Sequence, residues 1–168
     1  RLPIAHFGGY HRHNVTGLAH NIWGFPSDDP DTVDRLIHHL VGKLENRPME
    51  FAHYNELMVD DAEVLIISYG AAVRSALDVV RRQRERGERI GMLELQTLWP
   101  FPSTIVRERC ARARFVAVVE MNMGQIVREV QRVAEDKDRI FLINQVNGVL
   151  ISPEAILRAI RMIRGRGF

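Results

Sequence analysis

The sequence has almost no cysteine and no long apolar run, and each shortage excludes a class of protein. Cys110 is the single cysteine among 168 residues, so no intramolecular disulfide can form. An iron–sulfur cluster normally takes four thiolates, so this chain by itself cannot hold one. So little cysteine is typical of a cytoplasmic protein, which we expect here. No apolar run approaches the roughly 18 residues of a membrane-spanning helix.

The common phosphate-binding and nucleophile motifs are missing as well. No loop has the Walker spacing or G-x-G-x-x-G, and no turn resembles a nucleophile elbow. Gly70 precedes an expected helix whose amides could hold an anion, but a single glycine favours a tight turn. The early histidines have spacings that fit no metal-ligand pattern, so we expect no metal site; they are His6, His11, His13 and His20.

Length and composition are those of a globular chain with an appendage. The hydrophobic fraction is 46% and the charged fraction 26%, which is ordinary for a globular protein. Residues 1–30 are rich in glycine, histidine and proline without periodicity, so we interpret them as a connector or arm from a missing upstream domain. Residues 31–168 are then the folded α/β domain. The chain begins at Arg1 rather than Met, which suggests an excised or processed piece.

Strand and helix patterns alternate along most of the chain. Asp29 and Pro30 are suited to begin a helix that continues to residue 45, and a loop is expected over residues 46–61. Four apolar strands come next, at residues 64–68, 89–95, 115–119 and 139–143, and a helical pattern follows each of them in the sequence. This order predicts a three-layer α/β/α fold with an open, mostly parallel sheet of about five strands. The remaining strand is expected from residues 149–151 or from the N-terminal region.

Polar side chains gather where the 115–119 strand meets its helix. Glu120, Asn122 and Gln125 follow that strand directly, and strand carboxyl ends are where such sheets bind ligands. A buried carboxylate needs a partner. Glu120 could therefore act as a base or ligand contact, or it could accept hydrogen bonds from backbone amides of the next loop or from another protein. No second titrating group lies nearby in the sequence, so we favour the structural role.

Two motifs resemble the alpha subunit of the 2-oxoacid:ferredoxin oxidoreductases, most closely the 2-oxoglutarate type. The first is Thr97-Leu98-Trp99-Pro100-Phe101-Pro102, and the second is Val118-Val119-Glu120-Met121-Asn122-Met123-Gly124-Gln125. Residues 15–20 and 64–70 also fit that family, so the similarity spans nearly the whole chain. It implies a transketolase C-terminal-like domain at the end of the alpha subunit.

The resemblance also implies an activity located largely outside this chain. Such enzymes decarboxylate a 2-oxoacid oxidatively with thiamine diphosphate, pass electrons through iron–sulfur clusters to ferredoxin, and make an acyl-CoA. The implied partners are the upstream domain of the same subunit and a beta subunit that carries thiamine diphosphate, magnesium and the clusters. Coenzyme A and ferredoxin would bind to the whole complex, which the resemblance implies is a dimer of heteromers. Nucleic acid and membranes are not implied.

No catalytic or cofactor-binding residue is therefore assigned here. The candidate interface and strand-end residues are Gly70, Thr97, Trp99, Pro100, Phe101, Glu120, Asn122, Gly124 and Gln125. For the residues of the two motifs, Thr97 to Pro102 and Glu120 to Gln125, the role implied by the resemblance is packing against neighbouring domains. Two alternatives stay open: a stand-alone nucleotide- or coenzyme-A-binding module that uses Gly70, Glu120 and Asn122, and a structural dimerisation domain.

Overall fold

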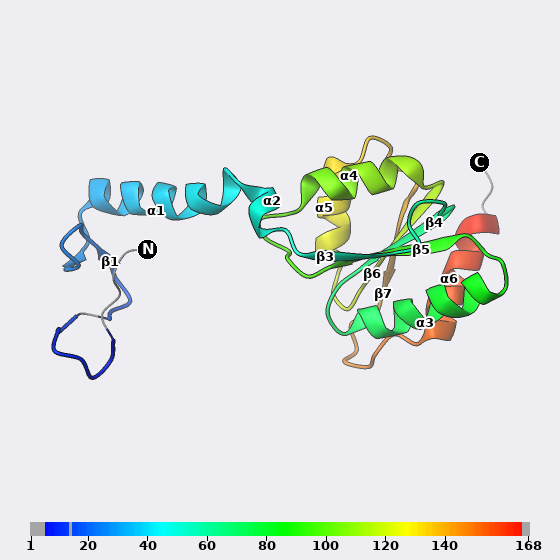
Figure 1. The fold of residues 1–168 in the computed structure, drawn as a ribbon, viewed down its shortest axis with the longest axis horizontal. Coiled ribbons are helices and arrows are strands. Elements are labelled where there is room, and N and C mark those ends of the chain that lie inside the picture. The colour runs from blue at the N-terminus through cyan, green and yellow to red at the C-terminus, as the bar shows by residue number, and fades with distance from the viewer. Residues whose placement is uncertain (1–5, 14, 166–168) are drawn as a thin grey trace. The chain divides into compact units, whose positions relative to one another are not determined.

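The computed structural model describes residues 6–13 and 15–165, and the contacts divide the chain into two units (Figure 1). The first unit ends at Arg47 and the second begins at Pro48. The helix that begins at Pro30 is thus grouped with the residues before it, whereas the sequence pattern starts the α/β domain at residue 31. The assignment of residues 1–30 as a connector stays a prediction.

The first unit is a short hairpin followed by an exposed helix. β1 (Ala19–His20) pairs antiparallel with β2 (Pro26–Ser27) within the stretch expected to be irregular. α1 (Pro30–Glu45) begins as predicted, because the Asp29 carboxylate accepts a hydrogen bond from Thr32 N at 2.9 Å. Its apolar stripe, however, buries no residue, and Ile37 is 52% exposed.

The second unit carries the sheet and the helices that cover it. Its elements are α2 (Pro48–Phe51), β3 (Tyr54–Leu57), β4 (Val64–Ser68), α3 (Ala72–Glu85), β5 (Ile90–Leu95), α4 (Ser103–Arg112), β6 (Phe115–Glu120), α5 (Gln125–Val133), β7 (Ile140–Asn144) and α6 (Pro153–Gly165). The strand order is β3-β5-β4-β6-β7. All pairs are parallel except β3 with β5. The predicted three-layer α/β/α fold is confirmed.

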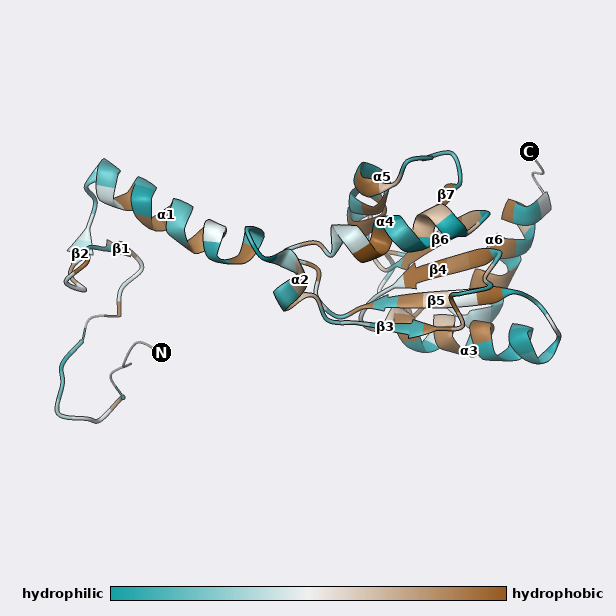
Figure 2. Cartoon of the chain, turned by 45° about the horizontal axis from the view of Figure 1, so that its top comes forward, coloured by the Kyte–Doolittle hydropathy of each residue, from teal (hydrophilic) through white to brown (hydrophobic). Residues whose placement is uncertain are grey.

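Alternating side chains of the central strands supply the core on both faces of the sheet. Leu65 and Ile67 pack in the cluster that contains residues of α4 and α5. Val64 and Ile66 pack in the opposite cluster, with α3 and α6. Figure 2 shows these strands as the most hydrophobic part of the second unit, with polar residues on the outer sides of the helices. Burial on both faces explains why these strands carry unbroken apolar runs.

The fifth strand lies where a loop was expected, which corrects the prediction. β3 pairs antiparallel with β5, so the strand comes neither from residues 149–151 nor from the N-terminal region. Asn55 and Glu56 are exposed in it, and Asn55 Nδ2 donates to the Glu94 carboxylate at 2.8 Å. A four-residue edge strand with polar side chains lacks the apolar signal by which the buried strands were recognised.

No helix within the described ranges combines the length and apolarity needed to cross a bilayer.

Candidate functional site

The Glu120 carboxylate closes the amino end of α5. Glu120 is the last residue of β6 and is fully buried. Its Oε2 accepts a hydrogen bond from Ile126 N at 2.9 Å, and its Oε1 accepts one from Val127 N at 3.0 Å. These amides belong to the first turn of α5, where backbone N–H groups have no acceptor within the helix. A negative charge is favoured at this end of a helix. Both carboxylate oxygens thus have backbone partners within the protein.

Asn122 fixes the turn between β6 and α5. Its Oδ1 accepts hydrogen bonds from Gly124 N at 2.8 Å and Gln125 N at 2.9 Å. Its Nδ2 donates to the Tyr69 hydroxyl, which follows β4. The side chain of Asn144, at the end of β7, donates to Asn122 O at 2.8 Å. One asparagine thus ties together the carboxyl ends of three neighbouring strands.

Gly124 is required by the shape of this turn. Its φ is +87°, in the left-handed region that side chains avoid. A Cβ at this position would lie 3.2 Å from both Leu142 Cδ2 and Val127 Cγ1. Gly70, at the corresponding turn after β4, has φ +59° but open space around it. Two of the candidate glycines therefore serve backbone turns, and Gly124 also serves close packing.

Tyr69 is a titratable group that lies within the electrostatic influence of Glu120. Partial burial raises the pKa of the Tyr69 phenol, and the negative charge of Glu120 raises the pKa further. The phenol therefore keeps its proton at neutral pH and accepts from Asn122 rather than serving as a base.

The Thr97–Phe101 motif lies at the end of β5 and organises a different loop. Thr97 Oγ1 donates to Phe51 O at 2.8 Å and accepts from His53 N at 3.2 Å, which fixes the entry into β3. Phe101 is buried in the core, and Pro100 before it is buried as well. The Trp99–Pro100 peptide is cis, and Trp99 is 54% exposed. The exposed indole is the part of this motif that is available to another domain.

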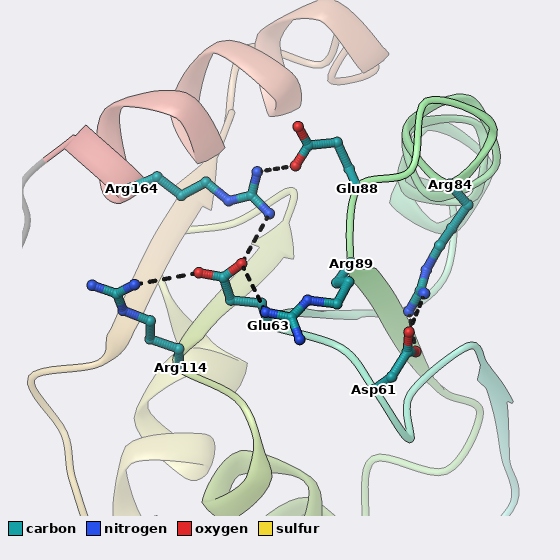
Figure 3. A network of polar contacts seen from close by, with 7 residues as sticks. All are labelled: Asp61, Glu63, Arg84, Glu88, Arg89, Arg114 and Arg164. Atoms are coloured by element: carbon teal, nitrogen blue, oxygen red, sulfur yellow. Dashed lines mark hydrogen bonds and ion pairs between the residues drawn. The ribbon is translucent and has the colours of Figure 1, made fainter.

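The opposite end of the sheet holds an arginine–carboxylate network that the sequence does not indicate (Figure 3). Arg84 binds the Asp61 carboxylate with two 2.7 Å hydrogen bonds, and its other donors reach the carbonyls of Met58 and Ile90. The Arg84 guanidinium holds the pKa of Asp61 below its usual range. The network joins loops far apart in the sequence.

Glu63 is the second centre of that network. Three guanidinium groups surround its carboxylate: Arg114 at 3.4 Å, Arg89 at 3.8 Å and Arg164 at 3.9 Å. The Glu63 backbone also bonds to Arg89 O and to the amides that begin β6. No sequence motif indicates this, because Glu63 and its three partners come from four separate segments.

The first unit has its own hollow, of about 500 Å³. The residues that line it come from the hairpin and α1: His20, Asn21, Ile22, Trp23, Thr32, Arg35, Leu36 and His39.

No group of three or more His, Cys, Asp or Glu in ligand geometry occurs among residues 6–13 and 15–165. Burial raises the pKa of the Cys110 thiol to about 12, so this cysteine is a packed apolar group rather than a ligand.

Comparison with known proteins finds a matching family and several relatives. Residues 62–156 match the family described as pyruvate:ferredoxin oxidoreductase core domain II. The 2-oxoglutarate synthase subunit KorA of Methanothermobacter thermautotrophicus is 39% identical over 155 residues, which are 92% of this chain and 41% of the relative. The counterpart from Methanocaldococcus jannaschii is 35% identical over 95% of this chain and 42% of its own length. The chain thus spans about two fifths of these relatives.

The fold also matches a solved enzyme. The structure described as 2-oxoglutarate:ferredoxin oxidoreductase from Magnetococcus marinus with 2-oxoglutarate, coenzyme A and succinyl-CoA bound aligns with a TM-score of 0.73. The alignment covers 90% of this chain and 27% of that chain at 22% identity. At that identity the similarity establishes the fold alone.

Proposed function

Because the chain belongs to the pyruvate:ferredoxin oxidoreductase core domain II family, we propose that it is the C-terminal domain of a 2-oxoacid:ferredoxin oxidoreductase alpha subunit. The 2-oxoacid is 2-oxoglutarate in this proposal, because the relatives at 35–39% identity carry the name 2-oxoglutarate synthase subunit. The complex would decarboxylate the 2-oxoacid oxidatively, form an acyl-CoA and pass electrons to ferredoxin.

The role of this domain in the proposal is assembly rather than chemistry. The observation that carries it is the use of the strand-end polar groups: both oxygens of Glu120 and the amide group of Asn122 bind within the protein itself. In folds of this type the strand ends are the usual ligand site. Here they hold a turn and a helix in place, and no free acid or base remains among them.

The residues present do not suit the cofactors that the family resemblance implies. An iron–sulfur cluster needs several thiolates, and the one thiol here is buried with a pKa of about 12. The α5 amides that could hold a phosphate group already bind the Glu120 carboxylate. We therefore place thiamine diphosphate, magnesium and the clusters on the rest of the complex.

A coupled assay tests this proposal. The chain alone, and a complex that contains it with the remainder of the alpha subunit and the beta subunit, are compared for 2-oxoglutarate- and coenzyme-A-dependent reduction of ferredoxin. We expect turnover by the complex and none by the chain alone. Turnover by the isolated chain would overturn the assembly role, and a complex active only on another 2-oxoacid would overturn the substrate assignment.

A titration separates this role from that of a nucleotide-binding module. Adenosine nucleotides, coenzyme A and thiamine diphosphate are titrated into the chain by calorimetry, with the Gly70→Val variant as the control. We expect no heat of binding. Micromolar binding that disappears in Gly70→Val would favour the module instead.

A further inference from the structure

The sheet ends at β7 with an unprotected edge. Within the part of the chain that the structure describes, β6 is the one neighbour of β7. Val116 N donates to Arg139 O at 2.8 Å, and Gln145 N donates to Glu120 O at 3.4 Å. The register pairs Val116 with Ile140 and Glu120 with Asn144. Odd-numbered residues of this segment therefore turn their backbone groups toward β6.

The even-numbered residues turn theirs toward the open edge, since backbone groups alternate in direction along a strand. These residues are Ile140, Leu142 and Asn144. The N–H of Ile140 bonds to Lys137 O at 3.1 Å and is satisfied locally. The N–H and C=O of Leu142, the N–H and C=O of Asn144 and the C=O of Ile140 face outward, available to another strand.

An apolar groove of about 320 Å³ runs beside this edge, between β7 and α6. Every residue that lines it is apolar: Ile140, Phe141, Leu142, Ile143, Ala159, Met162 and Ile163. Leu142 is 40% exposed and Met162 is 65% exposed. Proteins normally protect a free sheet edge with lysine, proline, a bulge or an inward-pointing charge. Residues 140–144 contain no charged residue and no proline.

We propose that β7 pairs with β7 of a second copy of this chain, antiparallel and centred on Leu142, so that two sheets join into one across a two-fold axis. In this register Leu142 lies opposite Leu142 of the second copy, and Ile140 lies opposite Asn144. The outward groups then form four hydrogen bonds: two between the Leu142 residues, and two from Asn144 N–H to Ile140 C=O. The proposal rests on the sheet edge and does not depend on the proposed function.

The charges beside the edge suit a second copy. In the same register Arg139 lies opposite Gln145 of the second copy, and Asp138 lies opposite Val146. No like charges meet over residues 138–146, so the strand is complementary to itself. Like charges directly opposite one another would instead destabilise such a pair.

The helix beside the edge is also placed for two-fold packing. α6 contacts both β6 and β7, and neighbouring strands are about 4.8 Å apart. Centred above those two strands, α6 would then lie about 10 Å from α6 of the second copy. This is the upper end of the usual 8–10 Å for packed helices. The exposed side chain of Met162 would be buried between them.

A disulfide test reads the register directly. Residues that exchange both hydrogen bonds across an antiparallel pair have Cα atoms about 5.5 Å apart, which a disulfide can span. Leu142→Cys should therefore form a covalent dimer under mild oxidation. Val146→Cys should not, because the two copies of residue 146 would lie about 26 Å apart along the strands. The native Cys110 is buried and does not compete.

Sedimentation equilibrium measures the association itself, with circular dichroism and urea unfolding confirming that each variant is folded. We expect a dimer of the unmodified chain, and at least a tenfold weaker dimer for Leu142→Lys and for Met162→Lys. Leu40→Lys is the matched control. The side chain of Leu40 is 43% exposed, a fraction similar to the 40% of Leu142, but Leu40 lies on α1. It should leave the dimer unchanged.

Three outcomes would overturn the proposal. The first is a chain that stays monomeric up to about 500 μM, the concentration at which an interface of about −4.5 kcal/mol is half occupied. The second is a dimer that Leu40→Lys weakens and Leu142→Lys does not. The third is disulfide formation at residue 146 as readily as at residue 142. None of these affects the oxidoreductase assignment, which the coupled assay tests.

Discussion

Replacing Glu120 with glutamine should destabilise the fold while leaving its shape unchanged. The carboxylate accepts hydrogen bonds from two α5 amides, at 2.9 and 3.0 Å, and is fully buried. A glutamine can accept one of those bonds, but its NH2 group turns a donor toward the other amide. One buried N–H then loses its partner inside the protein, where water cannot replace it.

The expected cost follows from these contacts. A buried donor left without a partner costs about 1–3 kcal/mol, and the lost negative charge at the helix amino end adds about 0.3–1 kcal/mol. We expect Glu120→Gln to lower the free energy of unfolding by about 1–4 kcal/mol. For a chain of this size that lowers Tm by about 2–16 °C.

Urea unfolding followed by far-UV circular dichroism measures the change, and Glu129→Gln is the matched control. Glu129 lies on the same helix, with its side chain 42% exposed and paired with Arg132 at 2.8 Å. Its replacement should cost no more than about 0.5 kcal/mol. If Glu120→Gln were as stable as the control, the two amide bonds would not be what holds α5 at the end of β6.

Three further predictions use the same measurements. Gly124→Ala should lower the free energy of unfolding by about 2–3 kcal/mol and Gly70→Ala by about 1–2 kcal/mol. Both glycines have positive φ, but only at Gly124 would the added Cβ also lie 3.2 Å from neighbouring side chains. Equal losses of stability would contradict this. Arg84 lowers the pKa of Asp61 from 3.8, so the pair stabilises the fold above about pH 4, and this stability is lost as pH falls through the folded pKa. The difference in urea midpoint between wild type and Asp61→Asn should therefore be full at pH 7 and shrink as the pH falls below 3.8; a difference that does not shrink there would contradict the pair. The Cys110 thiol, with a pKa of about 12, should react with Ellman's reagent at pH 8 at least 100-fold more slowly in the folded chain than in urea, and equal rates would show that it is accessible.

Part of the strand-end site could be predicted from the order of its residues alone. An apolar run that ends in a glutamate and an asparagine predicts a buried strand followed by a polar turn, and a buried carboxylate must have a partner. That reasoning left two structural partners open for Glu120, backbone amides of the next loop or another protein, and the structure shows amides of α5. It could group Tyr69 and Asn144 with these residues as strand-end polar groups, but it could not pair either of them with Asn122, because each reaches Asn122 from another strand.

The edge strand and the arginine network show where sequence reasoning fails. β3 is short and polar, so its place beside β5 depends on pairing that no local pattern records. Asp61 and Arg84 are 23 residues apart, and Glu63 and Arg114 are 51 apart. Scattered charges become a network only when the strands and helices bring their loops to one end of the sheet.

The sequence alone determined the order of the four buried strands and of the helices that follow them, the three-layer architecture and the family, because periodicity, turn residues and motifs are properties of neighbouring residues. Only the tertiary structure decided which strand is at each edge, which polar groups bind one another, and which apolar surfaces stay uncovered. Those outcomes depend on contacts between segments far apart in the chain, and their geometry is fixed when the sheet and its helices pack together.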